Sequence, residues 1–445
     1  MYKLNIGFAR VDITPEAYGP MGGLGNDERR ICTQVMDRPT GTCIAITDQA
    51  GQTVLFCPCD IIHAKQTVAT PTREAISAAT GIPFDRIMIC ASHNHAGPSI
   101  SAPGLEAVQE YYRYFAKQMT KAALEALEDR KPSQIYIGQQ QVPGMTFVRH
   151  YLMNDGTVAG AGFGSFKSGA KAHMTETDEQ MQLIRFVRDG GRDILLVNWQ
   201  CHVTIGAGPG CSTVMTADFP AVMRNHVEGA LGCHCAFFQG AAGNLVPSSK
   251  IEEENTVAHE RIAYGTRLAE FVLEGCKNLR PVDGGPVRTK SMRFESQIDH
   301  SDDHLLEQAT YVRDHFYDFE LRADRSKFCR ENGFNSILHA RGVIRRANMG
   351  QTADMEINAL AMGDISFITA PYEMFNSNGR FIKANTPYEM TFVCTCSNDT
   401  LDYLADINAF EYDCYEVNTR RFFAGTAEKV ADTYIEMLTE LKKEG

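Results

Sequence analysis

Two histidines separated by one residue, His93 and His95, directly follow a short apolar run in the sequence. The run Ile87–Cys90 has the length and composition of a buried strand, and Gly97 and Pro98 form a turn beyond it. Ligands of α/β proteins bind at the carboxyl ends of strands, and imidazoles placed there can bind a metal ion or transfer protons. The alternative is a pair of loop histidines with no shared task. A site therefore requires matching groups from other strands.

Three further strand-like runs end beside a side chain that can ligate a metal. They are Ile194–Trp199 before His202, Ile365–Thr369 before Glu373, and Met390–Thr395 before Tyr403. Two neutral imidazoles and a carboxylate suit a zinc ion, and three strong protein ligands leave a coordination position for water. Each residue alone is weak evidence, but the four together predict a metal site at the strand ends.

The intervening segments have apolar residues at helical spacing. The predicted helices cover residues 70–80, Leu105–Glu128, Asp218–Gly232, Thr256–Asn278 and Thr426–Lys442. Alternation of strands and helices predicts an α/β protein, with a mixed sheet core flanked by helices and the metal site at the strand ends. We expect residues 1–445 to form a single domain, in which a charged helical segment at about 303–347 is an outer layer or an insertion.

Composition restricts the partners and the location. With 445 residues, of which 44% are hydrophobic, the chain can bury a large core. Its 43 basic and 55 acidic residues give a net charge of −12 without any basic block, which argues against a nucleic-acid partner. The N-terminus lacks the pattern of a secretory signal, and no apolar run reaches membrane-spanning length. We therefore expect a cytoplasmic protein without stable membrane association, whose 14 scattered cysteines are reduced.

Several motifs resemble the neutral/alkaline non-lysosomal ceramidases, specifically their N-terminal catalytic domain. In chain order they are GFARVDITP, SHNHAGP, VRHY followed by NDG, WQCH, ADFP, QGAAGNLVP, APYEMF, NDTLDY and the YE pair at 415–416. SHNHAGP is the most specific of them. The others gain weight because they occur in the same order as in the family, over most of the 445 residues.

The resemblance implies both a fold and a set of site residues. It implies a ceramidase-like catalytic domain with a zinc ion bound by His93, His202, Glu373 and Tyr403. It also implies that His95, Arg149 and Tyr415 line the substrate pocket around the scissile carbonyl. Without the resemblance, Arg149 would be read as a surface ion pair and Tyr415 as a packed core aromatic.

Two departures from the family affect the expected substrate. Val246 stands where the ceramidases have a catalytically required serine, and a valine can be neither a nucleophile nor a proton donor. The sequence also lacks the C-terminal immunoglobulin-like domain and the secretory leader of those enzymes. Both departures argue against a membrane lipid as the substrate.

The sequence therefore predicts a zinc-dependent hydrolase. We expect it to use water activated by the metal ion on an amide bond, or less readily an ester bond, of a small soluble substrate rather than membrane ceramide. A metal-dependent lyase or a sugar-directed hydrolase on the same fold is the alternative, since a fold does not fix the chemistry. A catalytically inactive metal-binding protein is the third possibility.

Overall fold

The larger of two main sheets forms the centre of the molecule. The computed structural model describes residues 3–24, 29–160, 169–208, 213–248, 260–318, 324–412 and 414–444. In this sheet the strand order is β14-β12-β11-β6-β1-β3-β4-β5, and β16 pairs with β6. The strands are β1 (Leu4–Asp12), β3 (Thr40–Thr47), β4 (Thr53–Cys59), β5 (Ile87–Ala91), β6 (Lys131–Gln141), β11 (Gln180–Arg188), β12 (Ile194–Trp199), β14 (His234–Gln239) and β16 (Arg280–Val282). The pairs β4–β5 and β12–β14 are parallel, so the sheet is mixed.

A smaller sheet lies face to face with the larger one. It consists of β17 (Arg288–Gln297), β18 (Thr352–Met362), β19 (Ile365–Thr369) and β21 (Met390–Cys394), in that order, with β19 and β21 parallel. Alternate residues of both sheets point into one shared apolar core. At its centre the Phe367 ring lies 4.7 Å from that of Phe56 and 5.1 Å from that of Phe392. The two sheets are therefore held together by aromatic packing.

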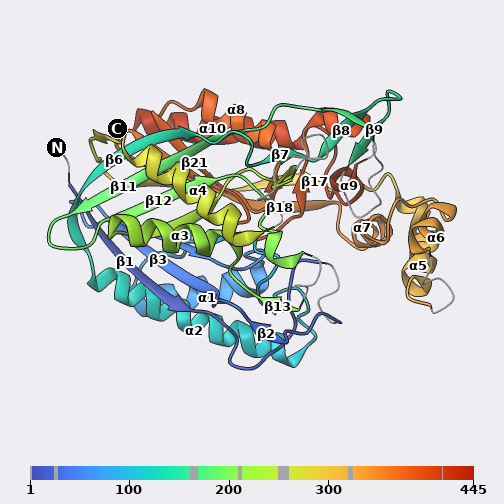
Figure 1. Cartoon of the computed structure of the whole chain (residues 1–445), viewed down its shortest axis with the longest axis horizontal. Coiled ribbons are helices and arrows are strands. Elements are labelled where there is room, and N and C mark those ends of the chain that lie inside the picture. The colour runs from blue at the N-terminus through green and yellow to red at the C-terminus, as the bar shows by residue number, and fades with distance from the viewer. Residues whose placement is uncertain are drawn as a thin grey trace.

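Helices cover the outer faces of both sheets (Figure 1). The larger sheet is covered by α1 (Gln66–Thr80), α2 (Glu106–Glu128), α3 (Asp218–Leu231) and α4 (Arg261–Cys276), and the smaller sheet by α8 (Asn376–Asn385) and α10 (Thr426–Lys443). On α2, the buried residues Val108, Tyr112, Phe115 and Met119 recur at spacings of three and four. Gly7 lets α2 approach the sheet, because a Cβ there would lie 1.8 Å from the Ala126 carbonyl oxygen. The predicted fold class, a mixed sheet core flanked by helices, is confirmed.

The charged segment contains several short helices. They are η5 (Asp303–Leu305), α5 (Leu306–His315), α6 (Arg325–Glu331) and α7 (Ile337–Ala347), and α5 and α6 project at one end of the molecule (Figure 1). These helices bury a small core of their own around Val312, Phe328 and Val343. Among the helices that the structure describes, none combines the length and the apolar composition that a membrane crossing requires.

Short elements connect the layers. They are β2 (Gln34–Val35), η2 (Phe84–Arg86), β7 (Phe147–Val148), β8 (His150–Met153), β9 (Val158–Gly160), β10 (Ala170–His173), η3 (Ile205–Ala207), β13 (Val214–Met215), β15 (Leu245–Val246), β20 (Glu373–Met374), β22 (Tyr403–Leu404), η7 (Ile407–Glu411) and α9 (Tyr415–Asn418). Two of these matter for the site: β20 and β22 pair in parallel and place Glu373 opposite Tyr403.

The packing of the two sheets makes a prediction about stability. Replacing the fully buried Phe392 by Ala should lower the free energy of unfolding by about 3–5 kcal/mol, because it leaves a cavity between the sheets. Urea denaturation followed by circular dichroism measures this change. Phe381→Ala is the matched control, since the Phe381 side chain on α8 is 42% exposed. Equal losses for the two variants would contradict the described core.

Candidate metal centre

Main-chain hydrogen bonds join the loops that leave the ends of β4, β5, β12, β14, β19 and β21. They run from Ser92 N to Cys59 O (2.8 Å), Ala91 N to Cys396 O (3.2 Å), His95 N to Val203 O (3.0 Å), His202 N to Leu245 O (3.1 Å), Gly243 N to Met374 O (2.7 Å) and Glu373 N to Asp402 O (2.9 Å). The strand ends of both sheets therefore meet in one place, and their side chains are fixed relative to one another.

Four side-chain acceptor atoms converge at this meeting point. The Oε2 atom of Glu373 lies 3.2 Å from His93 Nε2 and 3.3 Å from His202 Nε2. His95 Nε2 lies 3.1 Å from His93 Nε2. The side chains of His93, His202 and Glu373 are buried. The structure thus brings together three of the four ligands that the sequence predicts, with His95 beside them.

Main-chain carbonyls fix the orientation of each imidazole. Nδ1 of His93 donates to Ile62 O (3.1 Å), that of His95 to Gly23 O (2.7 Å), and that of His202 to Ala242 O (2.8 Å) and Leu245 O (2.9 Å). Because a carbonyl oxygen can only accept, Nδ1 must carry the hydrogen in every ring, and each neutral ring presents the lone pair of Nε2 to the others.

This arrangement of lone pairs fits a metal cation. Glu373 Oε2 is buried and has no hydrogen-bond partner among the described residues. Lone pairs of His93 and His95 face each other at 3.1 Å, which is favourable only when positive charge lies between the two nitrogens. Imidazole nitrogens and a carboxylate oxygen are the donor types that zinc prefers. The residues present therefore fit such an ion.

The charges around the centre shift the pKa values of its groups. Burial raises the pKa of Glu373, but the positive charge of His93 outweighs burial and holds that pKa well below its ordinary value. Burial lowers the pKa of His93, but the Glu373 carboxylate outweighs it and raises the value to about 10. Burial, Arg149 and His93 lower the pKa of His202 to about 4. At neutral pH, Glu373 is thus ionised and His202 neutral, the forms in which both bind metals, whereas His93 carries a proton on Nε2 that a metal ion would displace.

His63 also belongs to this centre, although sequence reasoning assigned it no role. Its Nε2 lies 3.2 Å from Oε1 of Glu373, the carboxylate oxygen that faces away from His202. His63 therefore orients the carboxylate, as groups behind metal ligands commonly do. The only sequence signal for it was its place shortly after the apolar run that becomes β4.

The remaining predicted site residues lie beside the imidazoles. The Tyr403 hydroxyl is 3.5 Å from His202 Nε2, and the Tyr403 ring lies 5.4 Å from that of Tyr415. The Arg149 guanidinium lies 5.5 Å from the Tyr403 ring centroid and 5.7 Å from that of Tyr415. Arg149 donates from Nε to Glu416 Oε1 at 2.5 Å and from Nη2 to the Gly243 carbonyl at 3.0 Å. Its ion pair is buried, so Arg149 is not in a surface ion pair.

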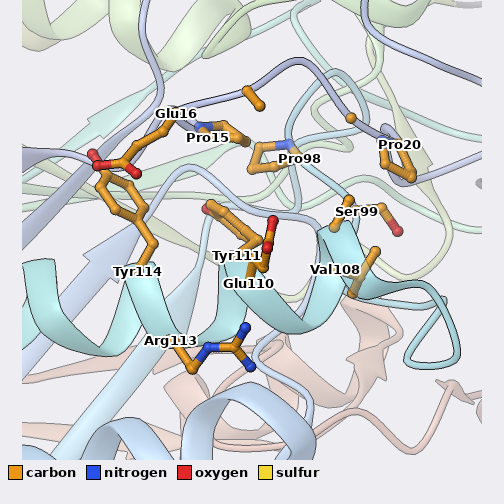
Figure 2. A pocket seen from close by; sticks show the side chains of 13 residues that line it. Pro15, Glu16, Pro20, Pro98, Ser99, Val108, Glu110, Tyr111, Arg113 and Tyr114 are labelled. Carbon is orange, nitrogen blue, oxygen red and sulfur yellow. The ribbon is translucent and has the colours of Figure 1, made fainter.

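All seven predicted site residues line one cavity of about 580 Å³, a volume typical of small-molecule sites. Its wall also includes His63, Val246, and Leu338, Arg341 and Arg345 from α7. A second cavity, of about 360 Å³, lies between α2 and the loop after β1. Figure 2 shows Tyr111 and Tyr114 of α2 beneath Pro15 and Pro98 in this second cavity, whose described lining includes no histidine. Of these two cavities, only the first is lined by imidazole groups.

Two known structures that share this architecture are ceramidases. The neutral ceramidase from Pseudomonas aeruginosa superposes with a TM-score of 0.74 at 15% identity, covering 100% of this chain and 75% of that one. The chain has the fold of a neutral ceramidase. A ceramidase complexed with C2 gives a TM-score of 0.73 at 16% identity, covering 100% and 76% of the two chains. No family model and no curated protein sequence matches. The resemblance to the ceramidase catalytic domain is confirmed for the fold.

The ion pair behind the ceramidase-like cavity makes a prediction about stability. The buried Glu416 carboxylate accepts a hydrogen bond from Arg149 Nε and a second one, at 2.9 Å, from His150 Nε2. Glu416→Gln should lower the free energy of unfolding by about 3–5 kcal/mol, because it leaves a buried guanidinium without its counter-charge. Chemical denaturation provides the measurement.

The control is Glu389→Gln, which breaks an exposed pair with Arg280 and should change stability by less than about 1 kcal/mol. A Glu416 variant as stable as this control would show that the buried pair contributes nothing to the fold.

Proposed function

We propose that this chain is a zinc-dependent hydrolase that cleaves an amide bond of a small substrate in the 580 Å³ cavity. The observation that carries the proposal is the convergence of His93 Nε2, His202 Nε2 and Glu373 Oε2, the last of which has no hydrogen-bond partner among the described residues. These three residues would hold the ion, with Tyr403 as the fourth ligand. When bound, a zinc ion supplies Lewis acidity, which lowers the pKa of a water molecule and polarises a substrate carbonyl.

Residues of the chain itself supply the hydrogen bonds that the reaction needs. Burial and the negative charge of Glu373 raise the pKa of Tyr415, so its hydroxyl group keeps its proton at neutral pH. Together with the guanidinium of Arg149, it can donate to the oxygen that gains negative charge as the amide carbonyl is attacked. Such donors are each worth about 2.7–4 kcal/mol in other enzymes. His95, which lines the cavity, would contact the substrate carbonyl.

Water is the nucleophile that this cavity supports. Val246 lies in the wall, at the position where the resemblance expects a serine, and offers no hydroxyl group. The wall does contain hydroxyl groups, from Ser101, Thr204, Thr400 and Thr419. Within the described part of the chain, none of these four is hydrogen-bonded to an imidazole that could remove its proton. No side-chain nucleophile is therefore assigned.

Metal analysis tests the proposed centre. The purified chain should bind about one equivalent of zinc, and His202→Ala should weaken zinc affinity by at least about 100-fold, because it removes a buried ligand. Competition with a chelating dye measures the affinity, and thermal melting checks that the variant is folded.

His226→Ala is the control, since it removes an exposed imidazole on α3 that does not line the cavity. Less than about half an equivalent of zinc, with no activity gained on adding metal, would refute the zinc hydrolase.

Substrate preference tests the proposed reaction. With zinc bound, the chain should release the amine from N-acyl amides with short acyl groups, whereas ceramide should react at least about 100-fold more slowly, a difference of about 2.7 kcal/mol in transition-state binding. Amine release followed by derivatisation and chromatography measures both rates. Efficient hydrolysis of ceramide would show instead that Val246 does not change the substrate class.

A further inference from the structure

The cavity wall is basic although the chain is acidic. The whole sequence has a net charge of −12. The side chains that line the cavity nevertheless include five basic residues, Lys65, Arg149, Arg341, Arg345 and Arg421, and only two carboxylates, Glu373 and Asp402. A concave wall of one charge sign concentrates ligands of the opposite charge. A negatively charged substrate would account for this contrast between the cavity wall and the whole chain.

Two of these arginines share a single carboxylate. Asp402 Oδ1 accepts from Arg345 Nη1 at 3.2 Å, and Asp402 Oδ2 accepts from Arg421 Nε at 2.5 Å. One negative charge thus faces two positive ones, and the trio is net positive. Arg345 also donates from Nη2 to the Thr419 carbonyl at 2.7 Å.

Arg421 keeps hydrogen-bond donors for a ligand. Only its Nε is used, and its terminal nitrogens Nη1 and Nη2 have no hydrogen-bond partner among the residues that the structure describes. Its side chain is 17% exposed and lies in the cavity wall. The planar fork of a guanidinium matches the oxygens of a carboxylate or a phosphate.

The basic trio lies next to the proposed metal centre. Asp402 directly precedes Tyr403, and its carbonyl oxygen accepts a hydrogen bond from Glu373 N at 2.9 Å. Packing also fixes Arg345: a Cβ at Gly342 would lie 2.9 Å from the Asn418 carbonyl oxygen, so α7 closely approaches the end of α9. A small substrate can therefore reach the metal centre and the arginines at once.

We propose that this basic wall, centred on Arg421 and Arg345, binds an anionic oxygen group of the substrate. Resting on the proposed function, this inference names the substrate class as N-acyl amides whose amine part carries a carboxylate or a phosphate, such as N-acyl amino acids. A neutral substrate would desolvate the terminal nitrogens of Arg421 without giving them an acceptor, which costs affinity. The basic wall thus favours an anionic substrate over a neutral ceramide.

Three probes with the same acyl group test the proposal on the zinc-loaded full chain. N-butanoylglycine carries a carboxylate, N-butanoyl-O-phosphoethanolamine a phosphate, and N-butanoylethanolamine is the neutral probe. At least one anionic probe should exceed the neutral one in kcat/KM by about tenfold or more, the range that a charge-assisted hydrogen bond provides. The faster anionic probe identifies the preferred group.

Arg421→Gln should lower kcat/KM for the preferred anionic probe about tenfold, through KM, and leave the neutral probe unchanged. Arg345→Gln is the second variant. In this variant Asp402 keeps Arg421 as its positively charged partner. Arg313→Gln is the control, since Arg313 pairs with the neighbouring Asp314 on the exposed face of α5. Thermal melting shows which variants are folded.

Two outcomes would overturn the anion site without contradicting the proposed hydrolase. In the first, the neutral probe reacts as fast as both anionic probes. In the second, Arg421→Gln leaves the preference for the anionic probe unchanged. Hydrolysis of none of the probes would instead refute the proposed function. In that case calorimetric binding decides the anion site: Arg421-dependent binding of an anionic probe, but not of the neutral one, supports it, and equal or absent binding overturns it.

Discussion

The hydrogen bond from imidazole Nδ1 to a main-chain carbonyl is the interaction on which the whole site depends. It holds the hydrogen on the outer side of each ring and leaves Nε2 facing the centre in His93, His95 and His202. The carbonyls belong to other loops, at Gly23, Ile62 and Ala242. An imidazole is therefore oriented only when the neighbouring loops are already in place, so the metal-binding geometry is a property of the folded sheets and not of the HxH motif.

Two residues in the loops around the site have a left-handed backbone conformation. His93 has a φ of 61° and Asp402 a φ of 63°, values that non-glycine residues adopt at a cost of about 1–3 kcal/mol each. At His93 the left-handed turn comes two residues after β5 ends at Ala91, and at Asp402 it comes immediately before Tyr403. The apolar core between the two sheets provides the stability that holds both conformations.

Sequence periodicity predicted the elements and the strand ends well, because buried strands and amphipathic helices leave local patterns. It located the runs before His93, His202 and Glu373, and the structure places Nε2 of both histidines within 3.3 Å of Glu373 Oε2. Stacking of two sheets could not be predicted, because inward-facing residues of either sheet look alike in sequence. His63 and Glu416 were missed for a related reason: each acts through a partner more than 200 residues away.

The charged helical segment is the clearest case in which a sequence pattern does not determine where its side chains lie. Its charges predict an outer layer or an insertion, yet α7 contributes Arg341 and Arg345 to the cavity wall. A charged residue has the same sequence signature whether it faces bulk water or a concave site, and only packing, here the close approach at Gly342, distinguishes the two. The candidate metal ligands come from strand ends fixed by both sheets, whereas much of the basic wall comes from helix and loop residues outside them. Substrate choice can therefore change through the wall while the centre and the fold stay the same.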